Sequence, residues 1–148
     1  MKPARRYAHG TDVPVSKTRG EIEALLTRHG AAQILSGIDR EQRSGFIGFT
    51  LHGRQYRIPL LGRSDRNRDP DQVERERWRS LLLLMKGKLE FIASGHSTPD
   101  VEFLAHTVLP GGSTVGAELA PRLDEVYRTG EVRALLEWQQ GGHLLTEG

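Results

Sequence analysis

The chain has no cysteine among its 148 residues. This absence excludes disulfide bonds, thiolate nucleophiles and zinc sites built on thiolates, and it is compatible with the cytoplasm, where we expect the protein. Long apolar runs are also missing, because the longest, LLLLM at residues 81–85, is far too short to cross a bilayer. No apolar run follows the basic residues of the first twelve positions, so we expect neither a secretory signal nor a membrane protein.

Lysine and aromatic residues are scarce, and arginine carries most of the positive charge. Arg outnumbers Lys seventeen to four, and Phe, Trp and Tyr together make up 6% of the chain. The net charge of +2 is unevenly placed, since residues 1–79 carry sixteen Lys and Arg against ten Asp and Glu, whereas residues 80–148 carry five against nine. Arginine favours bidentate contacts with phosphate, so this asymmetry fits a basic face that meets a polyanion. A GC-rich coding sequence explains the same excess of arginine, and both explanations stay open.

Capping signals predict two helices. Thr18 and Glu21 have the spacing of a capping box, so we expect residues 1–17 to be extended and a helix to begin at Thr18. Asp69 followed by Pro70 predicts the start of a longer helix that ends near residue 93. Its apolar side chains share one wide face, which predicts a helix central to the core. They are Trp78, Leu81, Leu82, Met85, Leu89 and Ile92.

Between these helices the pattern predicts three antiparallel strands. The first candidate is AQILSGI at residues 32–38. The segment GFIGFTLHGRQYRIPLL predicts a hairpin whose two-residue turn is His52-Gly53. Side chains alternate along each strand, so this turn gives the hairpin a core face and an outer face. The core face holds Ile47, Phe49, Tyr56 and Ile58, and the outer face holds Thr50, Gln55 and Arg57.

The last third of the chain predicts two or three short helices. Thr98-Pro99 opens one that we expect to run to Pro110, and residues 113–130 predict another that is interrupted near Pro121. The expected fold is therefore α+β, with an N-terminal helix, a three-stranded antiparallel sheet, a long central helix and these short helices. We expect a single domain over 1–148, composed of an extended arm (1–17), an α-β-β-β-α unit (18–95), a helical part (96–140) and a tail (141–148).

The stretch GRSDRNRDPDQVERERWRS, residues 62–80, contains six arginines and five acids. Arginines there and on the hairpin are suited to neutralise phosphates, whereas the interspersed acids fit a solvated linker and helix face. We expect a non-enzymatic accessory protein that binds nucleic acid electrostatically, with little reading of bases. The residues expected to contact nucleic acid are Arg40, Arg43, Arg54, Arg57, Arg63, Arg66 and Arg68.

Two resemblances bear on this expectation. The helix-strand-strand-strand-helix order of residues 18–93 is similar to that of the double-stranded-RNA-binding domain, which contacts RNA through its first helix, its first strand connection and a lysine cluster opening its last helix. Here the connection DREQRSG lacks the family's Gly-Pro-x-His, and PDQVERERWRS has acids in place of the lysines, so the resemblance implies the fold more than the function. The segments RYAHGTDVPVSKTRGEIEALLTRHGA, RERWRSLLLLMKGKLE and EFLAHTVLPGGSTVG resemble small phage and prophage proteins, which implies a phage context without a mechanism.

The alternative function is a protein-protein interaction module that inhibits or adapts a host complex. The last helix would supply the apolar anchors Leu135, Leu136 and Trp138, and a homo-oligomer that pairs two basic faces is a further alternative. Glu102 and His106 have the spacing of a metal-ligand pair on a helix, but no third ligand is signalled, so we expect no metal and no cofactor. No nucleophile elbow or phosphate-binding loop occurs, so we expect no catalytic residue, and a small enzyme or ligand-sequestering protein stays open as the third alternative.

Overall fold

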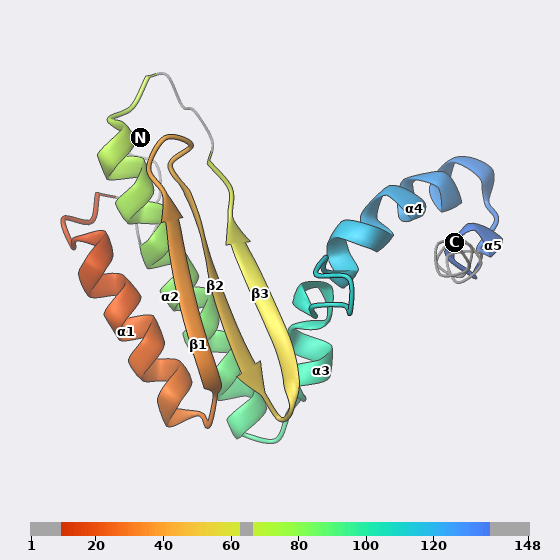
Figure 1. Cartoon of the computed structure of the whole chain (residues 1–148), viewed down its shortest axis with the longest axis horizontal. Helices are drawn as coiled ribbons and strands as arrows, with labels where there is room; N and C mark the ends of the chain where they lie inside the picture. Colours follow the sequence, from red (N-terminus) through yellow and green to blue (C-terminus); the bar gives the residue numbers. More distant parts are fainter. Residues whose placement is uncertain (1–9, 63–66, 137–148) are drawn as a thin grey trace, which may run out of the picture.

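The computed structural model describes residues 10–62 and 67–136, and it has the α+β order that the sequence predicts (Figure 1). Helix α1 (Val15–Arg28) precedes the strands β1 (Ala32–Asp39), β2 (Ser44–Leu51) and β3 (Arg54–Leu60). The long helix α2 (Pro70–Ala93) follows. After it come α3 (Pro99–Glu102), the 3-10 turn η1 (Leu104–His106), α4 (Val115–Thr129) and α5 (Arg133–Leu136). None of the described helices is both long and apolar enough to span a membrane.

The three strands form one antiparallel sheet in the order β1-β2-β3. The turn between β2 and β3 is His52-Gly53, and both residues have positive φ (50° and 76°), as a type I′ hairpin turn requires. The predicted register of this hairpin is confirmed, with the pairs Leu51–Arg54, Phe49–Tyr56 and Ile47–Ile58.

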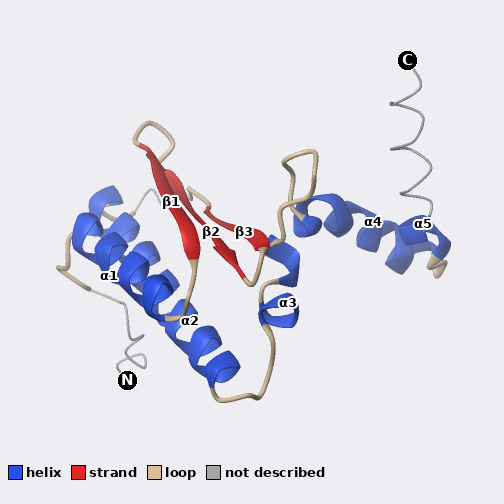
Figure 2. Ribbon diagram, turned by 60° about the horizontal axis from the view of Figure 1, so that its bottom comes forward, coloured by secondary structure: helices blue, strands red, loops and turns tan. Residues whose placement is uncertain are grey.

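Helices α1 and α2 lie together on one face of the sheet, and no other described helix covers the opposite face (Figure 2). The predicted core residues of the hairpin point toward the two helices and are at most 4% exposed: Ile47, Phe49, Tyr56 and Ile58. Thr50, Gln55 and Arg57 line a cleft on the opposite face, as the alternation predicted. The sheet therefore has one buried face and one open face.

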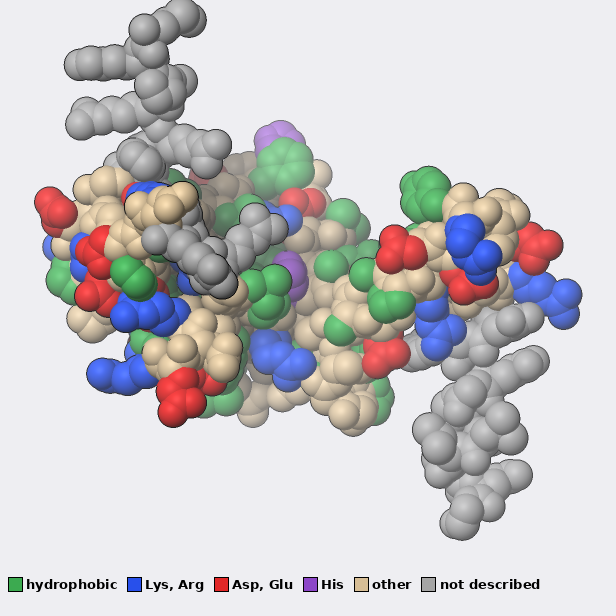
Figure 3. Space-filling view, turned by 90° about the horizontal axis from the view of Figure 1, so that it is seen from above, with side chains coloured by type: hydrophobic (Ala, Val, Ile, Leu, Met, Phe, Trp, Pro, Cys, Tyr) green, Lys and Arg blue, Asp and Glu red, His purple; other side chains and the backbone are tan. Residues whose placement is uncertain are grey.

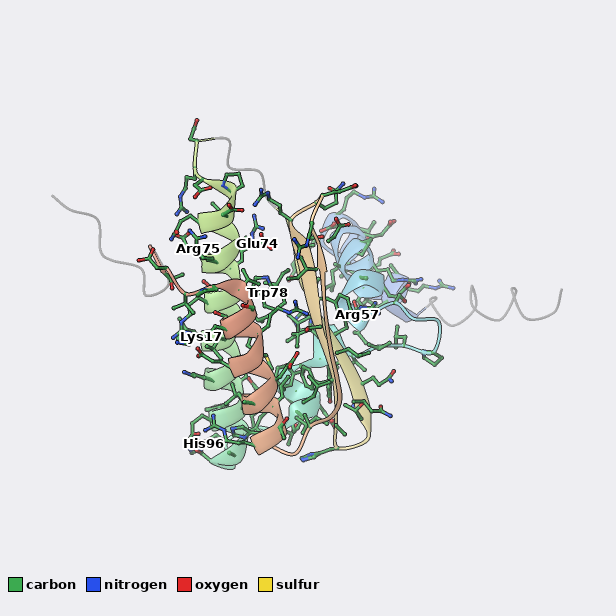
Figure 4. The ribbon with its side chains drawn as sticks, turned by 60° about the vertical axis from the view of Figure 1, so that its left-hand side comes forward. Lys17, Arg57, Glu74, Arg75, Trp78 and His96 are labelled. Carbon is green, nitrogen blue, oxygen red and sulfur yellow. The ribbon has the colours of Figure 1, made fainter. Side chains whose placement is uncertain are left out.

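Trp78 of α2 lies against a glycine of the central strand. A Cβ added to Gly45 would lie 2.8 Å from Cζ2 of Trp78 and 2.8 Å from the carbonyl oxygen of Gly37. The Trp78 ring is 1% exposed and lies between α2 and the sheet (Figure 4). The guanidinium carbon of Arg19 lies 5.7 Å from the centre of the same ring, so this tryptophan connects α1, α2 and the sheet.

Helix α1 begins at Val15 rather than at Thr18, so the capping-box prediction was wrong. Its N-cap is Pro14, whose φ of −59° is close to the helical value, and no side chain makes a cap hydrogen bond at this helix start. Thr18 lies inside the helix, where its side chain is fully buried and its hydroxyl donates to the carbonyl of Pro14. The spacing of a Thr and a Glu alone does not distinguish a cap from a buried helical position.

Helix α2 begins as predicted, because the Asp69 carboxylate accepts a hydrogen bond from the Asp71 amide and Pro70 takes the first helical position. The next helix is much shorter than predicted. Thr98 makes no side-chain cap bond, α3 ends at Glu102, and the chain continues as the 3-10 turn η1. Phe103 separates the two turns and is fully buried, so packing of this ring, rather than helix periodicity, sets the local backbone.

Helices α4 and α5 form an arm that projects from the rest of the molecule beyond β3 (Figure 1). We call residues 115–136 the helical arm. Helix α4 runs unbroken through Pro121, so the predicted interruption there was wrong; Pro121 is exposed, at the solvent side of the helix. The arm packs on η1 at its start, and its two helices pack on each other, but no residue of α4 is buried.

Two glycine substitutions test the packing of Trp78. Gly45→Ala should lower the free energy of unfolding by about 1–3 kcal/mol, because the new methyl group would collide with a fully buried ring. Gly87→Ala is the matched control inside α2: apart from the adjoining residues and backbone of its own helix, no atom lies within 4 Å of its added Cβ, so it should raise the free energy of unfolding by up to about 1 kcal/mol. Urea unfolding followed by circular dichroism measures both. A Gly45→Ala protein as stable as the wild type would contradict the contact.

Candidate functional site

Most of the described arginines predicted to bind nucleic acid are compensated by nearby acceptors. Three of them pair with carboxylates on different parts of the surface: Arg43 with Asp71 and Glu74, Arg54 with Asp100, and Arg68 with Glu76. The first two pairs join different elements, and the third joins the residues before α2 to the second turn of that helix. The described residues therefore do not form one uncompensated positive area.

The remaining predicted arginines divide among different places. Arg57 lies on the open face of the sheet (Figure 4), where its Nη2 donates to the carbonyl oxygen of Gly112 at 2.7 Å. Arg40 is exposed and makes no hydrogen bond or ion pair with another described residue. Arg63 and Arg66 lie outside the described residues. Figure 3 looks onto the end of the molecule that carries the start of α2, and basic and acidic side chains are interspersed there.

Two of the predicted arginines do converge in one place. Arg40 and Arg43 come from the connection between β1 and β2, and Arg19 comes from the second turn of α1. Together they face a cavity of about 370 Å³, which we call the arginine cleft. The residues that line it are Val15, Ser16, Arg19, Ile38, Arg40, Arg43, Asp71 and Glu74.

Charge in the arginine cleft is partly balanced. Nη1 of Arg43 donates to Oδ1 of Asp71 at 2.6 Å and lies 3.7 Å from Oε2 of Glu74. The hydrogen bond between them raises the pKa of Arg43 and lowers the pKa of Asp71, so both groups are charged at neutral pH. Glu74 points from α2 toward the strand connection (Figure 4). One guanidinium of the cleft is therefore occupied by the protein's own acids.

The other two guanidiniums of the cleft have no carboxylate contact. Arg19 donates to the hydroxyl of Ser36 at 2.6 Å and to its carbonyl oxygen at 3.3 Å, which fixes the guanidinium at the edge of β1. Arg40 has no such partner. The start of α1 adds partial positive charge, since its first turn holds no acidic residue. Sequence reasoning missed Arg19 because its neighbours in the cleft, Ser36 and the connection between β1 and β2, are far from it in sequence.

The predicted protein-interface residues belong to the helical arm or lie beyond it. Leu135 is half-buried in α5, the backbone of Leu136 ends that helix, and Trp138 lies outside the described residues. Other apolar side chains of this part of the chain are more exposed: Leu123 (42%), Tyr127 (87%) and Val132 (60%). The exposed apolar surface of the arm is thus carried mainly by residues that the sequence did not single out.

Glu102 and His106 do not face a common site. Glu102 accepts a hydrogen bond from the Ser97 hydroxyl at 2.6 Å, and its main-chain carbonyl accepts one from Nζ of Lys88 at 2.7 Å. His106 lines a different groove beside β3 and α2, where burial, followed by the charge of Lys88, lowers its pKa. Among the described residues there is no group of three or more His, Cys, Asp or Glu side chains that could hold a metal ion.

Comparison with known proteins identifies no relative of the chain. No protein-family model matches the chain, no curated protein matches it, and no solved structure matches its fold significantly. The functional argument therefore depends on the residues and their geometry.

The carboxylate of Glu76 gives a pH-dependent test of the charge pairing. It accepts hydrogen bonds from Nη2 of Arg68 at 2.5 Å and from the amide of Gly10 at 2.9 Å, and chiefly the Arg68 bond lowers the pKa of Glu76 to about 2. Folding lowers the pKa of Glu76, so the ionised carboxylate stabilises the folded protein. This stabilisation is complete above about pH 4.5 and is lost as the pH falls toward 2.

Glu76→Gln should lower the free energy of unfolding at pH 7 by about 1–2 kcal/mol. The difference from the wild type should shrink below pH 4.5 and be mostly lost near pH 2, where about half of the wild-type carboxyl groups are protonated too. Glu90→Gln, at an exposed position of the same helix, is the control and should change stability little at any pH. Chemical unfolding across this pH range measures the difference, and a constant difference would contradict the assigned pairing.

Proposed function

We propose that the protein is a protein-protein interaction module that binds its partner through the helical arm. The observation that carries this proposal is that α4, a helix of 15 residues, has no buried residue. An isolated helix of this length is only marginally stable in water, so most of its stability has to come from packing. Leu123, Tyr127 and Val132 leave apolar surface exposed on the arm, and surface of this kind is typical of interaction sites.

The root of the arm is held firmly by the α+β part. The Val115 amide donates to the carbonyl of Thr107, and the Val108 amide donates to the carbonyl of Gln55 on β3. Gly116 lies directly on η1, since an added Cβ would approach the carbonyl oxygen of Ala105 to 2.9 Å. This anchoring presents the arm in one direction and lowers the conformational cost of binding.

The chemistry of the arm indicates what kind of partner it fits. Asp124 lies next to Leu123 and one turn before Tyr127, and neither Asp124 nor the side chain of Glu131 forms an ion pair with a described residue. An apolar groove with basic residues on its rim complements this surface, as in other complexes in which an amphipathic helix enters a groove. The partner we propose is therefore a different protein, not a second copy of this chain, that has such a groove.

A double substitution on the arm tests this proposal. Leu123→Ser with Tyr127→Ser should weaken the complex at least about tenfold, because it removes the two central apolar anchors. Val101→Ser, at an exposed apolar residue outside the arm, is the matched control and should leave the affinity unchanged. Proteins captured from nuclease-treated host lysate by the wild type and by the control, but not by the arm variant, would be purified, and their dissociation constants measured by calorimetry.

Two results would overturn the proposal. One is that no purified partner distinguishes the arm variant from Val101→Ser. The other is that the arm variant changes only the mass of the protein itself in light scattering, because the arm would then join copies of this chain rather than a foreign protein.

Electrostatic binding of nucleic acid is a second candidate, and the arginine cleft is the observation that favours it. Arg19 and Arg40 bring two guanidiniums without carboxylate partners to one cavity beside the start of α1. In the double-stranded-RNA-binding domains that the α-β-β-β-α order resembles, the corresponding first helix and strand connection contact RNA. Asp71 and Glu74 oppose such binding, so it would involve few phosphates and show a shallow dependence on salt.

Removing the two acids of the cleft tests this candidate. The double variant Asp71→Asn with Glu74→Gln should bind mixed-sequence RNA or DNA roughly several-fold more tightly, because it releases the Arg43 guanidinium from its two acids. Arg40→Gln should weaken the binding. Asp100→Asn, which frees Arg54 elsewhere, is the matched control and should have no effect. Fluorescence anisotropy at low salt with single-stranded and duplex probes measures this. Absence of binding, or an equal gain from Asp100→Asn, would exclude the cleft as a nucleic-acid site.

A further inference from the structure

Three glycines of the sheet differ in what fills the space beside them. A Cβ on Gly45 would lie 2.8 Å from the Trp78 ring, and a Cβ on Gly37 would lie 2.4 Å from the Phe46 ring. These two positions need glycine because the protein's own aromatic rings occupy the space. Gly48 is different: the atoms nearest to its added Cβ lie 3.7–4.0 Å away, which is ordinary contact, and its φ is not in the left-handed region.

Glycine at position 48 therefore has no structural cause in the described part of the protein. Glycine weakens the interior of a strand, and β-branched residues are favoured there. Gly48 lies in the middle of β2, the central strand, where an added Cβ would make only ordinary contacts. What glycine provides at this position is empty space on the open face of the sheet.

That space is the floor of a cleft of about 380 Å³. The ring of Phe46, which lies over Gly37, forms one wall, and Leu35 of β1, which is 67% exposed, forms another. Val108, from the segment that bonds to β3, borders the cleft on the opposite side. The volume and the apolar walls are typical of sites for small ligands.

A few polar groups stand at the rim of this cleft. Arg57 is the cross-strand partner of Gly48, and its guanidinium makes one hydrogen bond, to the Gly112 carbonyl, and no ion pair with a described residue. No carboxylate balances its charge there, and four of its five N–H donors remain available. Gln33, held at φ 51° in the bulge of β1, accepts a hydrogen bond from the Thr50 hydroxyl at 2.9 Å and so presents its amide at the end of the cleft.

We propose that this cleft binds a small amphipathic anion. A flat apolar group would lie over Gly48 between Phe46 and Leu35, and a carboxylate, sulfonate or phosphate group would meet Arg57. The charge of Arg57 selects an anion, and the missing side chain at Gly48 selects a flat body. This site is separate from the arginine cleft and from the helical arm, so it does not depend on either proposed function.

Two fluorescent probes that differ in one charged group test the proposal. 1-Anilinonaphthalene-8-sulfonate carries a naphthalene ring and a sulfonate, and N-phenyl-1-naphthylamine has the same rings without the charge. Gly48→Val should weaken both probes by roughly tenfold, because its side chain fills the floor of the cleft. Arg57→Gln should weaken the sulfonate probe by roughly fivefold and leave the neutral probe within about twofold.

The matched control lies in the groove beside β3 and α2 that His106 lines. Leu84→Gln changes the lining of that groove and should leave both probes unaffected. Gly48→Val should melt at or above the wild-type temperature, since its Cβ meets no close atom and valine favours a strand. Circular dichroism measures this melting temperature. A variant that binds the probes more weakly but melts no lower than the wild type has lost binding and not folding.

Amide shifts in the wild-type protein give a measurement that does not depend on any variant. Addition of the sulfonate probe should shift the amide signals of Gly48, Thr50 and Arg57 in a nitrogen–proton correlation spectrum more than those around Leu84. The proposal is overturned if Gly48→Val binds as tightly as the wild type, if Arg57→Gln weakens both probes equally, or if the shifts map to the groove of Leu84.

Discussion

The fold depends on the packing of the Trp78 ring against Gly45. The glycine leaves a depression in the central strand, the ring fills it, and the guanidinium of Arg19 lies over the same ring. Because interiors are close-packed, a bulky ring in such a depression has few alternative positions. This contact fixes α2 on the sheet and brings α1 beside it, so a single face of the sheet supplies the core and no described helix covers the other face.

The position of α2 also decides the electrostatics of the molecule. Its first turns carry Asp71 and Glu74 to the connection between β1 and β2, where they meet Arg43. Two acids of the basic stretch are therefore partners of an arginine elsewhere in the sequence, whereas Glu76 pairs with Arg68 inside the stretch. Of the arginines expected to form the positive surface, Arg40 and Arg57 are the described ones without a carboxylate partner, and they lie at different cavities. The functional proposals therefore depend more on the apolar surfaces than on positive charge.

Those apolar surfaces are connected through one short segment. Val108 borders the cleft over Gly48, and Gly112 accepts the hydrogen bond of Arg57 just before the helical arm begins. The segment 107–115, which contains both residues, bonds to β3 through the Val108 amide and sets the direction in which the arm leaves. The open face and the arm thus share a common base, although we propose different occupants for them: a small amphipathic anion in the cleft and a protein groove around the arm.

Local chemistry made much of the fold predictable from the sequence. Alternation along the hairpin and the His52-Gly53 turn determined its register and its core face, and the Asp69-Pro70 start determined where α2 begins, because each depends on residues close together in the chain. Only the tertiary structure decided that Arg54 meets Asp100, that the rings of Phe46 and Trp78 fill two glycine positions and leave Gly48 open, and that the arm projects. These features join segments far apart in sequence, and no local pattern records which distant side chain fills a space or neutralises a charge.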